Sequence, residues 1–331
     1  MGGESVLLNR IEGTVFGGAI GDALGTLVEE MDKETVKRVY GGPILGFREP
    51  SSFSVCPFLR EGQYSHETQM FILALLVYIE KGKFDEDYYV EKLVEWLSDE
   101  KNHRYPAGGH LNAAAAYKQG AFPDEARVKS SEVDGVIPAV AAGLYRWDNG
   151  EDAYNEGCQI VSVVYNDDIL IDCGGIVSVA VSSIVGERAF LEMDDGKIEF
   201  LDMLRSFSQV ETVRSYLDLV INTLMDGIEN IDELVLRFGN GNFVLESLSL
   251  SLYIFLKWGN DFRKAVLKAV NSYGDFGGDT DAIGFLTGAF SGGYVGKRNI
   301  PVEWIENVEN SSYLDLLSKK FFEVVANEKN R

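Results

Sequence analysis

The sequence predicts an all-α fold, with many helices packed in layers within one domain spanning residues 1–331. Three features carry this prediction. Apolar residues recur at helical spacing along most of the chain. Alternating patterns typical of strands are few, and the best of them, residues 161–165, fits a helix equally well. Apolar residues make up 46% of the chain, enough for a sizeable core.

Two sets of glycines at a spacing of four mark the first expected helix and one near the end of the chain. They stand at positions 13, 17, 21 and 25, and at positions 284, 288, 292 and 296. This spacing places each set along one side of a helix. A glycine inside a helix costs about 0.5–1 kcal/mol relative to alanine, so we expect close approach of another backbone to offset that cost. The two helices should therefore lie deep and near each other.

A central helix is predicted between the two glycine sets. Residues 71–79 are apolar nearly all round, and Lys81-Gly82 supplies a C-terminal cation and a capping glycine. Periodicity predicts further helices at residues 86–98, 110–119, 135–147, 173–185, 211–226, 242–257, 260–272, 281–296 and 312–326.

Charge and composition exclude several classes of function. The net charge of −22 disfavours nucleic-acid binding, because a phosphate backbone would be repelled. The three cysteines are widely spaced, which suits a reducing compartment. The charge-free run at residues 173–186 is shorter than the roughly 20 residues that a membrane span needs. We expect a soluble, cytoplasmic protein with neither a membrane nor a nucleic-acid partner.

Asp279 and Asp281 form the first candidate site. They follow Gly277-Gly278 and open an apolar helix. Residues two apart on a helix point to different sides, so the two carboxylates converge only if Asp279 is the N-cap and Asp281 lies in the first turn. The alternative is a plain acidic helix cap.

Ser65, His66 and Glu67 open the central helix in a similar way. Ser65 is a good N-cap residue, and all three side chains are potential metal ligands. Oxygen donors suit Mg²⁺, Mn²⁺ or Ca²⁺, whereas an imidazole favours manganese, iron or zinc. The alternative is a capping or surface role for the same residues.

Acidic residues of the first helix form a third element. Asp22 lies within the helix, and Glu29 and Glu30 lie near its expected end, where the helix dipole disfavours a negative charge by about 0.3–1 kcal/mol. Carboxylates placed against that preference suggest a ligand or proton carrier. The alternative is a solvated acidic loop. Further along, Gly108, Gly109 and His110 lead into a helix and form either a phosphate-approach loop or a plain turn.

Together these elements resemble the ADP-ribosylglycohydrolase family. The similarity lies in residues 13–29 (GTVFGGAIGDALGTLVE), 64–70 (YSHETQM) and 277–294 (GGDTDAIGFLTGAFSGGY). The resemblance implies a single all-α orthogonal bundle that removes ADP-ribose from a modified side chain or related acceptor, with two Mg²⁺ ions in a cleft between these segments. It implies Glu29 and Asp22 as catalytic residues.

The chain departs from the family pattern at the metal ligands. Ser65, His66 and Glu67 stand where the family has Thr-Asp-Asp, and Ala282 stands where it has Thr or Ser after two aspartates. Because Mg²⁺ requires near-octahedral oxygen geometry, we expect one Mg²⁺ or Mn²⁺ ion, or none, rather than two. The expected metal site comprises Ser65, His66, Glu67, Asp279 and Asp281.

The substrate side departs as well. Residues 129–135 (KSSEVDG) fall where the family has a Ser-Asn-Gly element, and Glu132 and Asp134 add negative charge near an expected pyrophosphate. Tyr165 takes the place of a frequent family histidine. The expected substrate-binding residues are Gly108, Gly109, His110, Ser130, Ser131 and Tyr165.

Three functions follow from these observations. The first is metal-assisted hydrolysis of the glycosidic bond linking ADP-ribose to a protein side chain or small acceptor. The second is a catalytically impaired relative that binds ADP-ribose or a related nucleotide without turnover. The third is hydrolysis of another glycoside or nucleotide. The expected partner is ADP-ribose or an ADP-ribosylated protein.

Overall fold

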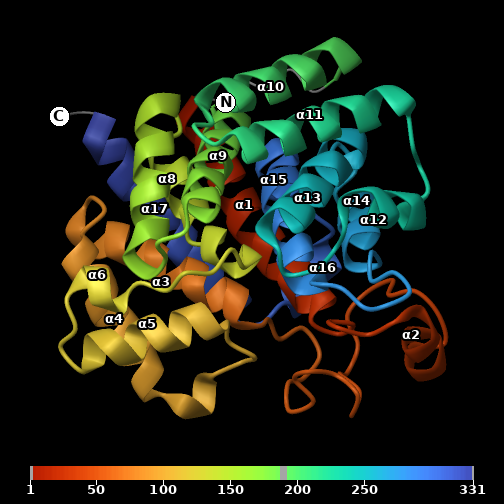
Figure 1. Cartoon of the computed structure of the whole chain (residues 1–331), viewed down its shortest axis with the longest axis horizontal. Coiled ribbons are helices and arrows are strands. Elements are labelled where there is room, and N and C mark those ends of the chain that lie inside the picture. The colour runs from red at the N-terminus through yellow and green to blue at the C-terminus, as the bar shows by residue number, and fades with distance from the viewer. Residues whose placement is uncertain (1–2, 187–191, 330–331) are drawn as a thin grey trace.

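Helices make up nearly all the regular structure in the computed structural model, which describes residues 3–186 and 192–329 (Figure 1). These residues hold no strand, only two isolated bridges, Val128–Tyr165 and Glu132–Phe243. The predicted all-α fold is therefore confirmed. The helices are α1 (Gly3–Gly25), α2 (Lys33–Tyr40), α3 (His66–Lys81), α4 (Glu86–Ser98), η1 (Glu100–Asn102), α5 (Gly108–Lys118), α6 (Pro123–Ala126), η2 (Val133–Val136), α7 (Ala139–Tyr145), α8 (Gly150–Val164), α9 (Asp168–Val185), α10 (Asp194–Phe207), α11 (Glu211–Asp226), α12 (Ile231–Phe238), α13 (Val244–Trp258), α14 (Phe262–Val270), α15 (Thr280–Val295), η3 (Lys297–Asn299), α16 (Val302–Asn307) and α17 (Ser311–Lys329).

The predicted helices match these elements with local differences. The expected helices at residues 86–98 and 211–226 coincide with α4 and α11. The expected helix at 135–147 is divided into η2 and α7, where Pro138 has no backbone N–H to continue the ladder. Residues 161–164 end α8, so the helical alternative is correct there. Periodicity did not predict α2, α8, α10 or α12.

The glycine sets bring α1 and α15 into direct backbone contact at the centre of the molecule (Figure 1). A Cβ atom added to Gly17 would lie 2.1 Å from the Gly288 carbonyl oxygen, and one added to Gly21 would lie 1.9 Å from that of Gly284. The helices run antiparallel, so Gly13 meets Gly292. The prediction is wrong for Gly296, which lies beyond the end of α15 at φ 75°.

One described helix, α9, is long and apolar enough to cross a membrane by length and composition alone. Its mean hydropathy is 1.8, and 83% of the helix is buried inside the protein. The helix begins at Asp168, five residues before the charge-free run that starts at Cys173, and it includes the charged residues Asp168 and Asp172. Packing against α7 and α8 accounts for the apolar composition of α9.

The α1–α15 contact also places three chain segments together. Gly25 at the end of α1 lies against Thr280 at the start of α15. The first residues of α3 lie beside Asp22 of α1. The end of α1 and the amino-terminal ends of α3 and α15 therefore meet, as the sequence predicts for its candidate site.

Candidate functional site

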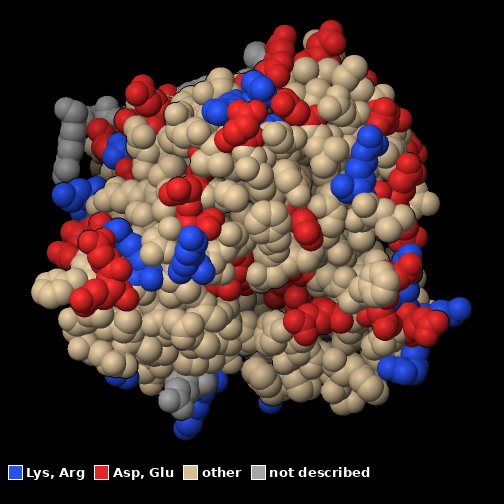
Figure 2. Space-filling view, viewed as in Figure 1, with Lys and Arg blue, Asp and Glu red and all other residues tan. Residues whose placement is uncertain are grey.

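A cavity of about 600 Å³ lies where these segments meet. Figure 2 shows acidic side chains deep in a hollow near the middle of this face of the molecule. Its lining comprises Glu29, Glu30, His66, Tyr105, Pro106, Ala107, Gly108, Glu132, Asp134, Gly241, Asn242, Phe276, Gly277, Gly278, Asp279 and Asp281. Among the residues that the structure describes, no lysine or arginine belongs to this lining.

Asp22 holds the start of α3 and lies behind the cavity rather than in its lining. Its Oδ1 accepts hydrogen bonds from the Ser65 backbone N–H (2.8 Å) and the Thr26 hydroxyl (3.0 Å). Its Oδ2 accepts from the backbone N–H and the hydroxyl of Thr68, at 2.9 and 2.6 Å. Ser65 caps α3, and its Oγ accepts from the Glu67 N–H. Both residues thus position the side chains that follow them.

Glu29 performs the same task for α15. Helix α1 ends at Gly25, so Glu29 is not at a helix C-terminus as expected but against the amino-terminal end of another helix. Its Oε2 accepts from the backbone N–H of Thr280 (2.6 Å) and of Asp281 (3.2 Å). Burial and the neighbouring charges of Asp281 and Asp279 raise the pKa of Glu29 well above its usual value. The start of α15 favours its negative charge, and the adjacent carboxylates oppose it.

Asp279 is the N-cap of α15 and Asp281 lies in its first turn, as predicted. Asp279 makes no capping hydrogen bond. Within residues 3–186 and 192–329, neither its Oδ1 nor Asp281 Oδ2 has a hydrogen-bond partner. Burial and the Asp22 charge raise the pKa of Asp281 to about 6. Burial and the Asp134 charge raise the pKa of Asp279 well above its usual value. A plain acidic cap does not account for oxygens left without a partner.

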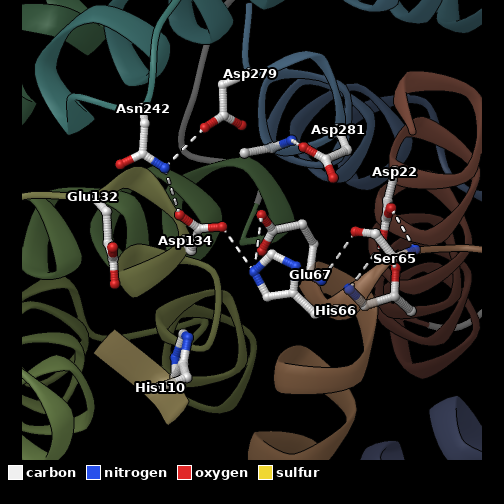
Figure 3. Close-up of polar contacts among 12 residues, drawn as sticks. Asp22, Ser65, His66, Glu67, His110, Glu132, Asp134, Asn242, Asp279 and Asp281 are labelled. Carbon is white, nitrogen blue, oxygen red and sulfur yellow. Dashed lines mark hydrogen bonds and ion pairs between the residues drawn. The ribbon is translucent and has the colours of Figure 1, made fainter. Parts of the chain in front are cut away.

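His66 and Glu67 meet Asp134 rather than Asp279 or Asp281 (Figure 3). His66 Nε2 lies 2.8 Å from Asp134 Oδ1 and 3.6 Å from Glu67 Oε1. Burial would lower the pKa of His66, but the carboxylates of Asp134, Asp281 and Asp22 together raise it. Burial and the Asp134 charge raise the pKa of Glu67 well above its usual value. The predicted ligands are thus divided between two adjacent groups.

Asn242 connects the two groups. Its side-chain amide donates to Asp134 Oδ2 at 3.0 Å and to Asp279 Oδ2 at 3.2 Å (Figure 3). Sequence reasoning treated Asp134 only as extra charge and overlooked Asn242. An acidic residue followed by an apolar run was the signal available for Asp134, whereas Asn242 lies in an ordinary polar loop.

The expected substrate-binding residues take up different places. Gly108 lines the cavity. Gly109 donates its backbone N–H to Glu132 Oε1 at 2.8 Å, and the Tyr165 hydroxyl donates to the same oxygen at 2.7 Å. His110 is buried behind them, and burial lowers its pKa to about 3. Ser130 and Ser131 are half-buried outside the cavity lining.

Comparison with known proteins identifies relatives of this chain. The family model described as ADP-ribosylglycohydrolase matches residues 4–331. The chain belongs to the ADP-ribosylglycohydrolase family. It is 25% identical to an uncharacterized protein of Archaeoglobus fulgidus, over 95% of this chain and 96% of that protein. It is 23% identical to the ADP-ribosylarginine hydrolase Tri1 of Pseudomonas putida, over 96% of this chain and 78% of that protein.

A solved structure shares the fold. The ADP-ribosylglycohydrolase-related protein complex superposes with a TM-score of 0.75 at 17% identity, covering 97% of this chain and 99% of that chain. The family model thus shows the family of this chain, and the solved structure shows its fold.

The acidic residues of this family member fit a divalent cation. Glu29, Asp279 and Asp281 each offer a carboxylate oxygen, and these atoms lie within 4.8 Å of one another. Asp279 and Asp281 each keep an oxygen that no group of the described chain contacts by a hydrogen bond. Buried carboxylates without partners carry a large free-energy cost that a cation removes. An all-oxygen set of this kind suits Mg²⁺ or Mn²⁺.

Proposed function

We propose that this family member hydrolyses the glycosidic bond between ADP-ribose and a protein side chain or small acceptor. The observation that carries the proposal is the position of Glu29, Asp279 and Asp281. These buried carboxylates come from two ends of the chain, and all three line one cavity. Its volume, about 600 Å³, lies within the roughly 300–1,000 Å³ range of small-molecule sites.

Asp279 and Asp281, beside Glu29, would hold one Mg²⁺ or Mn²⁺ ion. Such an ion supplies charge that offsets the carboxylates and polarises the ribose hydroxyls next to the bond that breaks.

Glu29 is the proton acceptor in this proposal. Its Oε2 is fixed by the two N–H groups at the start of α15, which orients the carboxylate in the cavity wall. Burial raises its pKa, which makes the ionised carboxylate a stronger base. A carboxylate beside the bond also stabilises the positive charge that develops on the ribose as the bond lengthens.

Release of free ADP-ribose tests the proposal directly. Peptides ADP-ribosylated on arginine or on serine are incubated with the protein and with Mg²⁺ or Mn²⁺. We expect turnover with one acceptor, and a loss of about 10²-fold or more in kcat for Glu29→Gln. Folded protein that releases no ADP-ribose from several acceptors with either metal would contradict the proposal.

A second candidate is binding of ADP-ribose without turnover. His66 and Ala282 replace two of the family's metal-ligating residues, which disfavours turnover. Glu132 accepts the Gly109 N–H at the start of α5, so a phosphate does not meet a free N–H group there. Together with Asp134 it brings negative charge to a cavity whose lining has no lysine or arginine. Calorimetry separates the two candidates, because ADP-ribose binding by a protein that shows no turnover would support the second.

A further inference from the structure

Arg104 joins three parts of the chain beside the cavity. Its guanidinium donates a hydrogen bond to the Tyr64 carbonyl oxygen at 2.9 Å and lies 5.3 Å from the centre of the Tyr64 ring. The same guanidinium donates to both carboxylate oxygens of Glu309, and the distance from Nη2 to Oε1 is 2.9 Å. The Arg104 carbonyl oxygen accepts from the His66 N–H at 3.1 Å. Arg104 therefore holds the residues on both sides of Ser65, the N-cap of α3.

Glu309 lies in the turn between α16 and α17 and has further contacts with the approach to α3. Its backbone N–H donates to the Gly62 carbonyl oxygen at 2.8 Å, and its Oε1 also accepts from the Gln63 side-chain amide at 2.7 Å. The next residue, Asn310, donates its side-chain amide to the Tyr64 hydroxyl at 3.3 Å. The approach to α3 is therefore held by a turn that lies 246 residues later in the chain.

The Arg104–Glu309 pair is shielded from water. The two side chains are 14% and 13% exposed, whereas those of the surface pair Arg263–Glu303 are 43% and 58% exposed. Desolvation offsets much of the attraction in a shielded pair, so such a pair contributes little net stability. A fork of two hydrogen bonds fixes the direction of both side chains, which the ammonium group of a lysine does not do. The pair is therefore suited to setting geometry.

The residue after Arg104 belongs to the cavity wall. Tyr105 lines the cavity together with residues 106–108, and its hydroxyl donates to Glu30 Oε1 at 2.6 Å. Tyr105 and Glu30 both have a left-handed backbone, with φ of 56° and 59°. Residues other than glycine keep this strained conformation only where their surroundings hold them in it. Arg104 supplies part of that restraint, because its side chain and its carbonyl oxygen are fixed just before the strained residue.

We propose that Arg104 is a positioning residue for the candidate site. It sets the start of α3, where His66 lines the cavity, and the Tyr105 loop in their places relative to each other. Arg104 itself is not among the residues that line the cavity, so it acts through these neighbours. The kinetic consequence rests on the proposed hydrolysis, whereas the contacts are independent of it. The alternative is an ion pair that serves stability alone.

Arg104→Lys separates positioning from stability. The lysine keeps a positive charge opposite Glu309 but cannot reach that carboxylate and the Tyr64 carbonyl oxygen in the original directions. We expect a Tm close to that of the wild-type protein, with kcat for ADP-ribose release about 10–100-fold lower and little change in KM. The matched control is Arg263→Lys, because Arg263 is also paired with a glutamate and lies over an aromatic ring, outside the cavity lining. The control should keep the wild-type kcat.

Hydrogen exchange followed by mass spectrometry supplies a readout that needs no substrate. In Arg104→Lys we expect exchange about tenfold faster in peptides holding residues 62–68 and 104–110, and unchanged exchange in α8 and α9. If this variant does not fold, Glu309→Gln replaces it and should give the same pattern, because it removes the charge that orients Arg104.

Unchanged exchange in both segments would overturn the inference. Faster exchange with an unchanged kcat would do so as well, because Arg104 would then be a stabilising contact only. A wild-type protein that releases no ADP-ribose from any acceptor would count against the proposed hydrolysis alone. The exchange rates would then decide whether Arg104 sets the two segments in place.

Discussion

At the scale of single residues, Asp22 shows how a buried carboxylate can organise a site without facing it. Its two oxygens accept four hydrogen bonds, three of them from Ser65 and Thr68 in the first turn of α3 and its cap. The start of α3 is thereby fixed to α1. His66 and Glu67 owe their positions to this contact. The role of Asp22 in the chemistry itself stays a prediction.

Asp22→Asn should lower the free energy of unfolding by about 2–3 kcal/mol, because the amide nitrogen cannot accept the two hydrogen bonds that the oxygen in its place accepts. Urea denaturation measures this change. Asp85→Asn is the control, since Asp85 is the half-buried N-cap of α4 and asparagine caps about as well. Equal stability of the two variants would contradict the positioning role of Asp22.

The position of Phe276 leads to a second prediction at this scale. It lines the cavity, yet its side chain is 98% exposed. Stacking of a nucleobase on an aromatic ring is worth roughly 1–3 kcal/mol. If the proposed substrate stacks there, Phe276→Ala should raise KM roughly tenfold with little change in kcat. Phe122→Ala, which removes an exposed ring outside the cavity, is the control. An unchanged KM would exclude stacking at this ring.

At the scale of elements, the contact between α1 and α15 sets the geometry of the site. The carbonyl oxygens of one helix lie where Cβ atoms of the other would be, so the two backbones approach as closely as glycine permits. The end of α1 and the start of α15 are held together at the same end of this contact, where Gly25 lies against Thr280. Glu29 reaches the N–H groups of α15 because of it.

Gly17→Ala should destabilise the protein by about 3 kcal/mol, since its Cβ would lie 2.1 Å from a backbone oxygen that cannot move aside. Thermal denaturation measures the effect. Gly108→Ala serves as the control, because no atom lies within 4 Å of a Cβ added at this first residue of α5. A Gly17→Ala protein as stable as the control would show that the helices can move apart without cost.

At the scale of the whole molecule, a net charge of −22 is combined with buried carboxylates at one place. Figure 2 shows that acidic side chains outnumber basic ones around the hollow on this face. Negative charge outside and inside the cavity attracts cations and repels anions. A divalent cation should therefore affect the folding stability of this protein as well as its chemistry.

The metal-free protein should become less stable as the pH rises from about 4 to 6 and beyond. The pKa of Asp281 is raised to about 6, so the folded state holds a proton that the unfolded state has already lost. The raised pKa values of Glu29, Glu67 and Asp279 act in the same direction, as does that of His66. The pKa of Asp134 is lowered, so this residue acts in the opposite direction. The stabilisation that it contributes is lost as the pH falls below the usual pKa of an aspartate.

Thermal unfolding measured across this range, with and without Mg²⁺ or Mn²⁺, checks the expectation. Metal ions should raise Tm more at pH 8 than at pH 5, because protons compete for the same oxygens. Sodium chloride at equal ionic strength is the control for general screening. A metal-free Tm that rises steadily with pH would contradict the charge balance described for the site.

Much of the fold could be predicted because its signals are local. The periodicity of α4 and α11, the capping residues Ser65 and Asp279, and the spacing of the glycines each lie within a few turns of chain. Helices such as α8 and α10 escaped notice, since their polar faces and acidic starts dilute the apolar pattern. The order of the acidic motifs was sufficient to indicate the family and the place where the segments meet.

The sequence by itself determined the helical fold, the paired glycine helices and the carboxylates that open α3 and α15. Only the tertiary structure decided how those carboxylates are grouped. Glu29 lies at the start of α15, His66 and Glu67 lie with Asp134, and Asn242 joins the two groups. The physical reason is that these contacts join residues far apart in the chain, and the packing of α1 against α15 sets their distances.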